Sequence, residues 1–173
     1  ELVGQAQEVT RIAFQKPVEI TDMGIFVGDQ RRMSISEFEP FSIRVVCRHH
    51  EALPRVSINL GIWRADGVQV WWSPSGYLAS NIENHVGMSQ VEFKFDPNIL
   101  GYGDYSLHVY AVNGFSWDNC PSSEIFDSSR GDTIFKVTLA RPIQFGLVNL
   151  EPTVAIRLED KKGWIKNPAP ALP

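Results

Sequence analysis

Cysteine is scarce in this chain, since its 173 residues include only Cys47 and Cys120. Two cysteines do not make a disulfide framework, and disulfides persist mainly in oxidising compartments. We therefore expect two free thiols, with a Cys47–Cys120 disulfide as the alternative. Cys47 follows Phe41, Ile43 and Val45 at alternate positions, which predicts a small buried residue on a strand. The length suffices for one domain with a substantial hydrophobic core.

Long apolar runs, an excess of positive charge and a phosphate-binding loop are also missing. No apolar run approaches the roughly 20 residues that a membrane-spanning helix needs. The formal net charge is −4, which argues against nucleic-acid binding, because phosphate contacts require a basic surface. The pattern G-x-x-x-x-G-K-[ST] does not occur, so we expect no ATP hydrolysis by this chain.

The arrangements typical of catalysis and metal binding are equally absent from the sequence. There is no G-x-S-x-G nucleophile motif. Glu92 is predicted on the outward face of a strand, but no second carboxylate can be placed opposite it, as a glycosidase requires. His49 and His50 are neighbours on a strand and point to opposite faces, so they cannot easily share one ion. We predict no catalytic activity, no cofactor and no metal.

Short stretches of alternating apolar and polar residues recur along the chain, separated by Gly, Pro, Asn and Asp. This pattern is typical of an all-β antiparallel sandwich, and no helix is predicted. The predicted strands are residues 8–15, 18–27 (interrupted at Met23-Gly24), 33–38, 41–48, 56–63, 68–72, 89–95, 104–113, 133–139 and 153–158. We expect one domain over residues 1–160 and a flexible tail over 161–173.

Two internal connections are longer than ordinary hairpin loops, and long loops of a sandwich often carry function. Residues 74–88 have room for one helical turn, and residues 114–132 are polar. The second connection contains Glu124, Asp127 and Asp132, without the Asp-x-Asp-x-Asp-Gly pattern of a calcium loop. We expect it to be a solvated acidic loop.

The most informative stretch is the predicted hairpin of residues 55–73. Its first strand alternates four aliphatic residues with Ser57, Asn59, Gly61 and Trp63, which is the period of a half-buried strand. Asp66-Gly67 supplies the tight turn. If the aliphatic residues face the core, Trp63 stands on the polar face beside Asn59. A Trp in that position is unfavourable unless a loop, a partner chain or a ligand covers it.

The returning strand carries the adjacent residues Trp71 and Trp72, which must face opposite sides of the sheet. With Val68 and Val70 facing inward, Trp72 is predicted in the core and Trp71 outward beside Trp63. The two outward indoles, with Asn59, would make a platform for a sugar, whose apolar C–H face stacks on indole. The alternative is that Trp63 and Trp71 cover each other or pack in a dimer interface.

Arg44, Arg48, His108 and Tyr110 are predicted at outward positions of two other strands. If those strands share a sheet with the hairpin, their side chains can bind an acidic sugar or a terminal phosphate. The alternative is a solvated polar face with cross-strand pairs.

Four segments occur in an order that matches a known family. They are VGQAQEVTRIAF with ITDMGIFVGDQRRMSISEFEPFSIRV, LPRVSINLGIWRADGVQVWW, VEFKFDPNILGYGDYSLHVY, and GDTIFKVTL with FGLVNL. The third matches F-x-F-x-x-x-x-L-x-x-G-x-Y-x-L, with Gly103 and Tyr105 at the G-x-Y positions. Over residues 4–149 the chain resembles the carbohydrate-binding C-terminal domain of the ATPase subunit of O-antigen polysaccharide ABC transporters (the Wzt type).

The resemblance implies an immunoglobulin-like β-sandwich that forms a homodimer by strand exchange. It implies recognition of the terminus of a lipid-linked lipopolysaccharide O-antigen at the cytoplasmic face of the inner membrane. The nucleotide-binding domain would precede Glu1, and the partners would be the nucleotide-binding and transmembrane subunits. Residues 154–164 extend past the usual closing strand and would be an added strand or the exchanged piece.

These observations predict a non-catalytic module that binds the terminus of a bacterial polysaccharide for export. One alternative is a β-sandwich that serves protein–protein contact and dimerisation and has no glycan site. A sandwich hydrolase is a third class, and it would show turnover that depends on a carboxylate.

Overall fold

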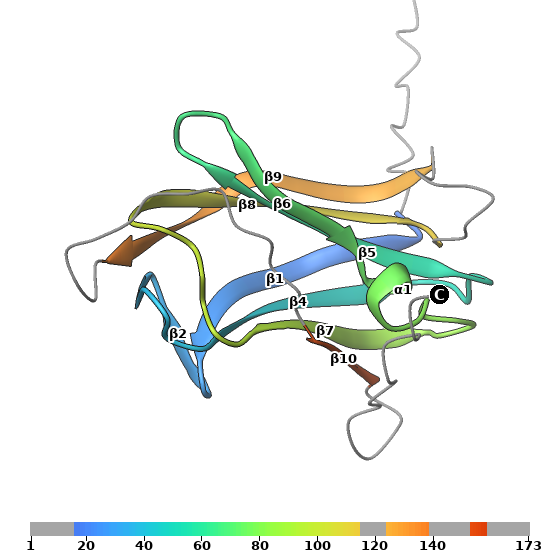
Figure 1. The fold of residues 1–173 in the computed structure, drawn as a ribbon. Coiled ribbons are helices and arrows are strands. Elements are labelled where there is room, and N and C mark those ends of the chain that lie inside the picture. Colours follow the sequence, from blue (N-terminus) through green and yellow to red (C-terminus); the bar gives the residue numbers. More distant parts are fainter. Residues whose placement is uncertain (1–15, 115–123, 139–152, 159–173) are drawn as a thin grey trace, which may run out of the picture.

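The part of the chain that the structure describes folds into two five-stranded β-sheets that pack face to face (Figure 1). The computed structural model describes residues 16–114, 124–138 and 153–158. The first sheet has the order β10-β7-β4-β1-β2, and the second has the order β3-β9-β8-β5-β6. All strand pairs are antiparallel except β3 with β9, which is parallel. The all-β, immunoglobulin-like sandwich predicted from the sequence is confirmed.

Within the described ranges the elements are strands and one short helix. They are β1 Val18–Val27, β2 Gln30–Arg32, β3 Ser34–Ser36, β4 Phe41–His49, β5 Val56–Arg64, β6 Gln69–Pro74, α1 Ser75–Leu78, β7 Gly87–Phe95, β8 Gly103–Asn113, β9 Ile125–Thr138 and β10 Thr153–Leu158. The predicted strand over residues 8–15, the tail 161–173 and Cys120 lie outside the described residues.

Two predictions of local structure were wrong. β1 runs without interruption through Met23-Gly24. Its one irregularity in the pairing with β4 lies earlier, between Ile20 and Asp22. The predicted loop 114–132 includes the first half of β9, which begins at Ile125. This half of β9 is polar and does not alternate cleanly, yet it pairs with β8 across two bulges. Pairing with a neighbouring strand satisfies its backbone, which a local pattern does not reveal.

The core lies between the sheets and is built from the inward-facing residues of most strands. Phe41 and Phe95 stack at 4.7 Å between ring centroids, and Tyr105 stacks on Phe135 at 5.5 Å. The Tyr105 hydroxyl donates a hydrogen bond of 2.7 Å to the Gly101 carbonyl. This resembles the tyrosine corner of Greek-key sandwiches, in which a Tyr hydroxyl bonds the backbone a few residues upstream.

Cys47 is a free thiol with no exposure to solvent. Burial raises the pKa of this thiol to about 12, with a smaller contribution from the negative charge of Asp127. The thiol is therefore protonated at neutral pH and behaves as a small core residue, as the sequence predicted.

Asp127 is a buried residue of β9 and not part of a solvated acidic loop. Its carboxylate accepts hydrogen bonds from the backbone N–H of Ile20 at 2.8 Å, the N–H of Ser128 at 2.9 Å and the ammonium of Lys16. Burial opposes ionisation, but these donors outweigh it and lower the pKa of Asp127. Because Ile20 belongs to β1 and lies at its register shift, the Asp127 carboxylate of β9 joins the two sheets at this irregular position.

His49 at the end of β4 is buried, 2% exposed, and lies 2.8 Å from the Ser89 hydroxyl through its Nε2. His85 packs edge-on against it at 5.1 Å. Burial, with a smaller contribution from His85, lowers the pKa of His49 from 6.5 to about 4. The folded protein therefore holds a neutral imidazole that takes up a proton more readily after unfolding.

We expect acid to destabilise the protein through His49. Between pH 6.5 and pH 4 the unfolded state binds more protons than the folded state, so stability falls as the pH falls. The shift corresponds to at most about 3 kcal/mol, lost fully below pH 4. Denaturant unfolding at several pH values should show that His49→Gln loses less stability over this window than the parent. His50→Gln is the control, and an unchanged slope in His49→Gln would contradict the prediction.

Candidate functional site: a groove with aromatic walls

A groove of about 240 Å³ opens on the outer face of the second sheet. Strands β5, β6, β8 and β9 supply its walls and floor. The lining residues are Asn59, Trp63, Gln69, Trp72, Tyr110, Val112 and Ile125. Asn59 and Trp63 face outward because the residues between them, Leu60 and Ile62, are fully buried in the core.

Two indoles form the aromatic walls. Trp63 stacks on the His108 ring, with 5.2 Å between centroids and 26° between planes. Trp72 is 37% exposed, a large value for this side chain. Gly61 lies between the two indoles, and a Cβ there would be 3.1 Å from Trp63 Nε1 and 3.4 Å from Trp72 Cδ1. The absence of a side chain at position 61 thus lets both indoles lie close over β5.

We expect Gly61→Val to disturb the groove without unfolding the sandwich. A branched side chain suits a strand, but its atoms would occupy the space in which the two indoles lie. A changed tryptophan fluorescence spectrum and at least about tenfold weaker retention of any groove ligand are the expected results. Gly101→Ala is the control, because a Cβ at that position meets nothing within 4 Å. If Gly61→Val retained the groove ligand as the parent does, the empty space above position 61 would not be needed for binding.

Polar groups lie between and beside the indoles. Asn59 is only 7% exposed, and its Oδ1 accepts a hydrogen bond of 3.3 Å from the Ser57 hydroxyl. This contact leaves the amide nitrogen as the donor that Asn59 offers to the groove. Tyr110 lies directly opposite Asn59 on β8 and is half-buried. The groove therefore combines apolar faces with fixed hydrogen-bonding groups.

Arg130 brings a positive charge to one side of the groove. It lies opposite His108 in the β8–β9 pairing, and its guanidinium is 5.2 Å from the centre of the Tyr110 ring. Burial lowers the pKa of His108, Arg130 lowers it further, and Asp132 opposes both. His108 is therefore mainly neutral at pH 7, and Arg130 is the cation at this end.

The structure brings together four of the predicted site residues: Asn59, Trp63, His108 and Tyr110. The prediction that Trp71 faces outward was wrong. Trp71 packs edge-on against Phe93 and Phe95 of the other sheet, at 6.2 and 5.3 Å. Trp72, predicted in the core, lines the groove in its place.

A bulge causes this exchange of the two tryptophans. Ile62 pairs with Trp71 on β6, but the next residue, Trp63, pairs with Gln69. Val70 is therefore an extra residue on β6, and both Val70 and Trp71 pack toward the core. An extra residue reverses the faces of the residues beyond it, so alternation counted from Val68 assigns the wrong tryptophan.

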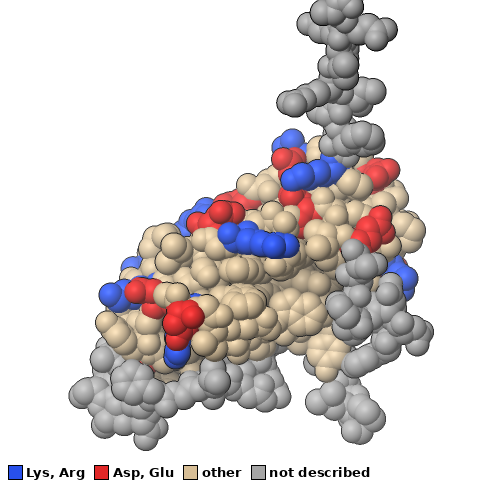
Figure 2. Space-filling view, turned by 90° about the horizontal axis from the view of Figure 1, so that it is seen from above, with Lys and Arg blue, Asp and Glu red and all other residues tan. Residues whose placement is uncertain are grey.

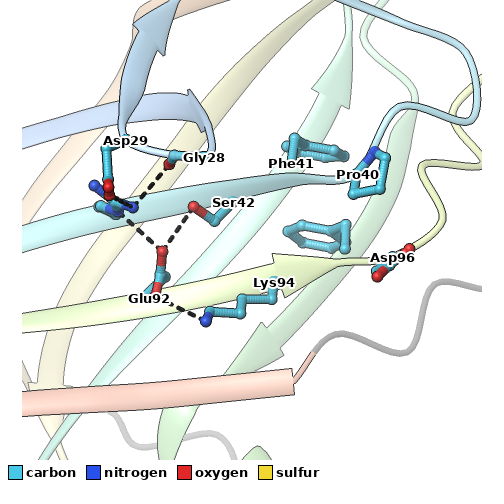
Figure 3. Close-up of a pocket in the computed structure, with 10 residues that line it drawn as sticks. Gly28, Asp29, Pro40, Phe41, Ser42, Glu92, Lys94 and Asp96 are labelled. Carbon is cyan, nitrogen blue, oxygen red and sulfur yellow. Dashed lines mark hydrogen bonds and ion pairs between the residues drawn. The ribbon is translucent and has the colours of Figure 1, made fainter. Parts of the chain in front are cut away.

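Arg44 and Arg48 lie on β4 in the first sheet and do not join this groove. Arg48 is exposed. The Arg44 guanidinium binds Glu92 at 2.9 Å, Asp29 at 3.0 Å and the Gly28 carbonyl at 2.9 Å (Figure 3). Glu92, predicted as an outward acid for which no second carboxylate could be placed, is buried in a charged network.

Several groove residues could not be predicted from any local pattern. Arg130 and Ile125 fell in the segment predicted as a loop, and Gln69 and Val112 stood at positions with no distinctive pattern. The adjacent Trp71 and Trp72 did indicate that one of these two indoles lies on the outer face of the sheet.

The surface around the second sheet carries charges of both signs. Figure 2 looks onto this layer and shows acidic and basic side chains interspersed around an extended uncharged area. In the part of the chain that the structure describes, no group of three His, Cys, Asp or Glu side chains is placed to hold a metal ion. No helix of that part is long and apolar enough to cross a membrane.

These features define an immunoglobulin-like sandwich with an aromatic groove on one outer face. No protein-family model matches the chain, and no curated protein sequence matches it. Among solved structures, it is similar to the crystal structure of the C-terminal domain of Wzt, with a TM-score of 0.63 and 19% identity. The match covers 76% of this chain and 78% of that chain.

The resemblance to the Wzt-type C-terminal domain predicted from the sequence is therefore confirmed for the fold. A second similar structure is the Pseudomonas fluorescens alkylpurine DNA glycosylase AlkC bound to DNA containing an abasic site analog. It has a TM-score of 0.45 and 10% identity, and covers 70% of this chain and 30% of that chain. A likeness that weak carries no argument about this protein.

Proposed function

We propose that this chain is a non-catalytic carbohydrate-binding module that recognises the terminus of a bacterial O-antigen polysaccharide. The observation that carries the proposal is the groove itself, where Trp63 and Trp72 flank a floor with Asn59. The fold likeness to the C-terminal domain of Wzt supports the same reading.

The chemistry of the groove suits a sugar. Indole faces stack on the C–H face of a pyranose, while Asn59, Gln69 and Tyr110 exchange hydrogen bonds with its hydroxyls. The volume of about 240 Å³ is below the range of about 300–1,000 Å³ typical of drug-sized ligands. We therefore expect one terminal sugar residue in the groove, with Arg130 beside any negative group that it carries.

An open site of this size should bind weakly, because little area is buried and hydroxyls are already solvated by water. We propose that the protein acts as a homodimer, so that two sites together retain one assembly more firmly. Its other partners would be the nucleotide-binding and transmembrane subunits of an ABC transporter. The site would then face the lipid-linked polysaccharide at the cytoplasmic side of the inner membrane.

A protein–protein contact module is the second candidate. The observation that favours it is the apolar character of the groove rim, where Trp72 is 37% and Ile125 is 51% exposed. Exposed apolar groups of this kind also occur in interfaces between chains. In that case the groove would be covered by another polypeptide and would not retain glycans.

The test is binding of the purified chain to a panel of bacterial O-polysaccharides, each with a sample that lacks its terminal modification. Retention of one intact glycan and loss of its end-truncated form is the expected result. Equal retention of both forms would contradict recognition of the terminus. A well-folded sample that retains no glycan of a broad panel would favour the protein-contact module.

A further inference from the structure

A second pocket, of about 330 Å³, lies on the outer face of the first sheet, on the opposite layer from the aromatic groove (Figure 3). The β1–β2 turn, the start of β4 and the end of β7 surround it. Its lining residues are Gly28, Asp29, Pro40, Phe41, Ser42, Arg44, Glu92, Lys94, Phe95 and Asp96.

Glu92 is the central polar group of this pocket and is only 3% exposed. Its Oε1 accepts hydrogen bonds from the Ser42 hydroxyl at 2.8 Å and from Arg44 Nε at 2.9 Å. Its Oε2 faces the ammonium of Lys94 at 3.5 Å, which is an ion pair and longer than a good hydrogen bond. One carboxylate oxygen is thus fixed by protein donors, and the other still has capacity to accept.

A purely structural role explains this arrangement poorly. A buried ion pair rarely stabilises a fold more than well-packed apolar residues of similar size would. Arg44 is nevertheless held on several sides, by Glu92, Asp29 and the ring of Phe26 at 4.4 Å. A rigid carboxylate beside a half-exposed ammonium, both at a cavity, is the preorganised geometry that a binding site requires.

The charges of the pocket restrict what it can hold. Its lining includes three carboxylates, Asp29, Glu92 and Asp96, and two cations, Arg44 and Lys94. The carboxylates would repel an anionic ligand, and the two cations would repel a cationic ligand. A neutral ligand with adjacent hydroxyls can donate to Glu92 Oε2 and accept from Lys94 Nζ at the same time. Pro40, exposed at the edge, offers an apolar contact for a ring.

We propose that this pocket is a second carbohydrate site, which binds one neutral sugar ring through a vicinal diol between Glu92 and Lys94. It differs from the aromatic groove in residues and in mode, because charged hydrogen bonds replace indole stacking. The two sites lie on opposite faces, so occupation of one does not require the other.

The test is a titration of the ¹⁵N-labelled chain with methyl glucoside, methyl galactoside and methyl mannoside, followed by NMR. At least one should shift the amide signals of residues 28–29, 42–44 and 92–96 saturably, with a Kd on the order of 1–10 mM. Lys94→Met should raise this Kd by at least about fivefold, the effect of one lost hydrogen bond. Lys136→Met, an exposed lysine elsewhere, and Trp63→Ala should leave it unchanged.

Glu92→Gln provides a second variant that retains size and shape but removes the charge, and its thermal unfolding verifies the fold. It should weaken binding as Lys94→Met does. No saturable shift around Glu92 with any neutral sugar up to about 100 mM would overturn the proposal. The proposal would also be overturned if the amide signals around Glu92 shifted only with glucosamine or glucuronate and with no neutral sugar. Shifts confined to the groove residues would overturn the second site and leave the groove proposal standing.

Discussion

Trp63→Ala should weaken glycan retention by at least about 30-fold while the sandwich stays folded. The indole is half-buried, stacks on His108 and forms one wall of the groove. Aromatic anchors in binding sites typically contribute about 2 kcal/mol or more, which corresponds to a factor of about 30 in Kd. Because Trp63 lies on the outer face, its removal leaves no cavity in the core. Retention of the best glycan of the panel, with circular dichroism as the check on folding, measures the effect.

Tyr102→Ala is the matched control for Trp63→Ala. Tyr102 is also an exposed aromatic, 46% exposed, but it contacts Lys136 and lies outside the groove. The Tyr102→Ala variant should retain the glycan as the parent does. If Trp63→Ala retained the glycan fully, the groove would not be the sugar site. If Trp63→Ala turned a parent dimer into folded monomers without changing glycan retention, the groove would be a contact surface between chains.

Asp127→Ala should lower the free energy of unfolding by about 3 kcal/mol. The substitution leaves the backbone N–H of Ile20 without its acceptor and removes the partner of Lys16. A hydrogen bond to a charged group contributes about 1.5–3 kcal/mol, and an orphaned buried donor costs about 1–3 kcal/mol. The two effects overlap, so the expected loss is below their sum. Urea unfolding at pH 7 measures it.

Asp132→Ala is the control for Asp127→Ala, since Asp132 is exposed on the same strand and bonds the Ser129 hydroxyl. It should change stability by no more than about 0.5 kcal/mol. Equal effects of the two substitutions would contradict the role of Asp127 in joining the sheets.

Acid separates the contributions of Asp127 and His49. Folding lowers the pKa of Asp127, so its stabilisation is present above the ordinary pKa of this carboxyl, 3.8, and is lost as the pH falls through the folded pKa. The contribution of His49 is lost earlier, between pH 6.5 and pH 4. The parent should therefore lose stability in two steps, of which Asp127→Ala removes the more acidic one.

Much of the candidate site could be predicted because strand alternation is a local property. Consecutive side chains of a strand point to opposite faces, so buried Leu60 and Ile62 place Asn59 and Trp63 outward. The same reasoning placed His108 and Tyr110 outward on β8, and the pairing of β8 with β5 brought them beside Trp63. Where the alternation is broken by a bulge, as at Val70, the same reasoning failed.

The sequence by itself determined the all-β class, the position of most strands and the outward face of Trp63, because these follow from the period of apolar residues. Only the tertiary structure decided which strands share a sheet. It placed Arg44 with Glu92 on one layer and Trp63 with His108 on the other. Sheet membership depends on hydrogen bonding between segments far apart in the chain, and bulges shift that pairing by a residue. Neither leaves a periodic signal, so the grouping of residues into the two pockets became visible only in the folded chain.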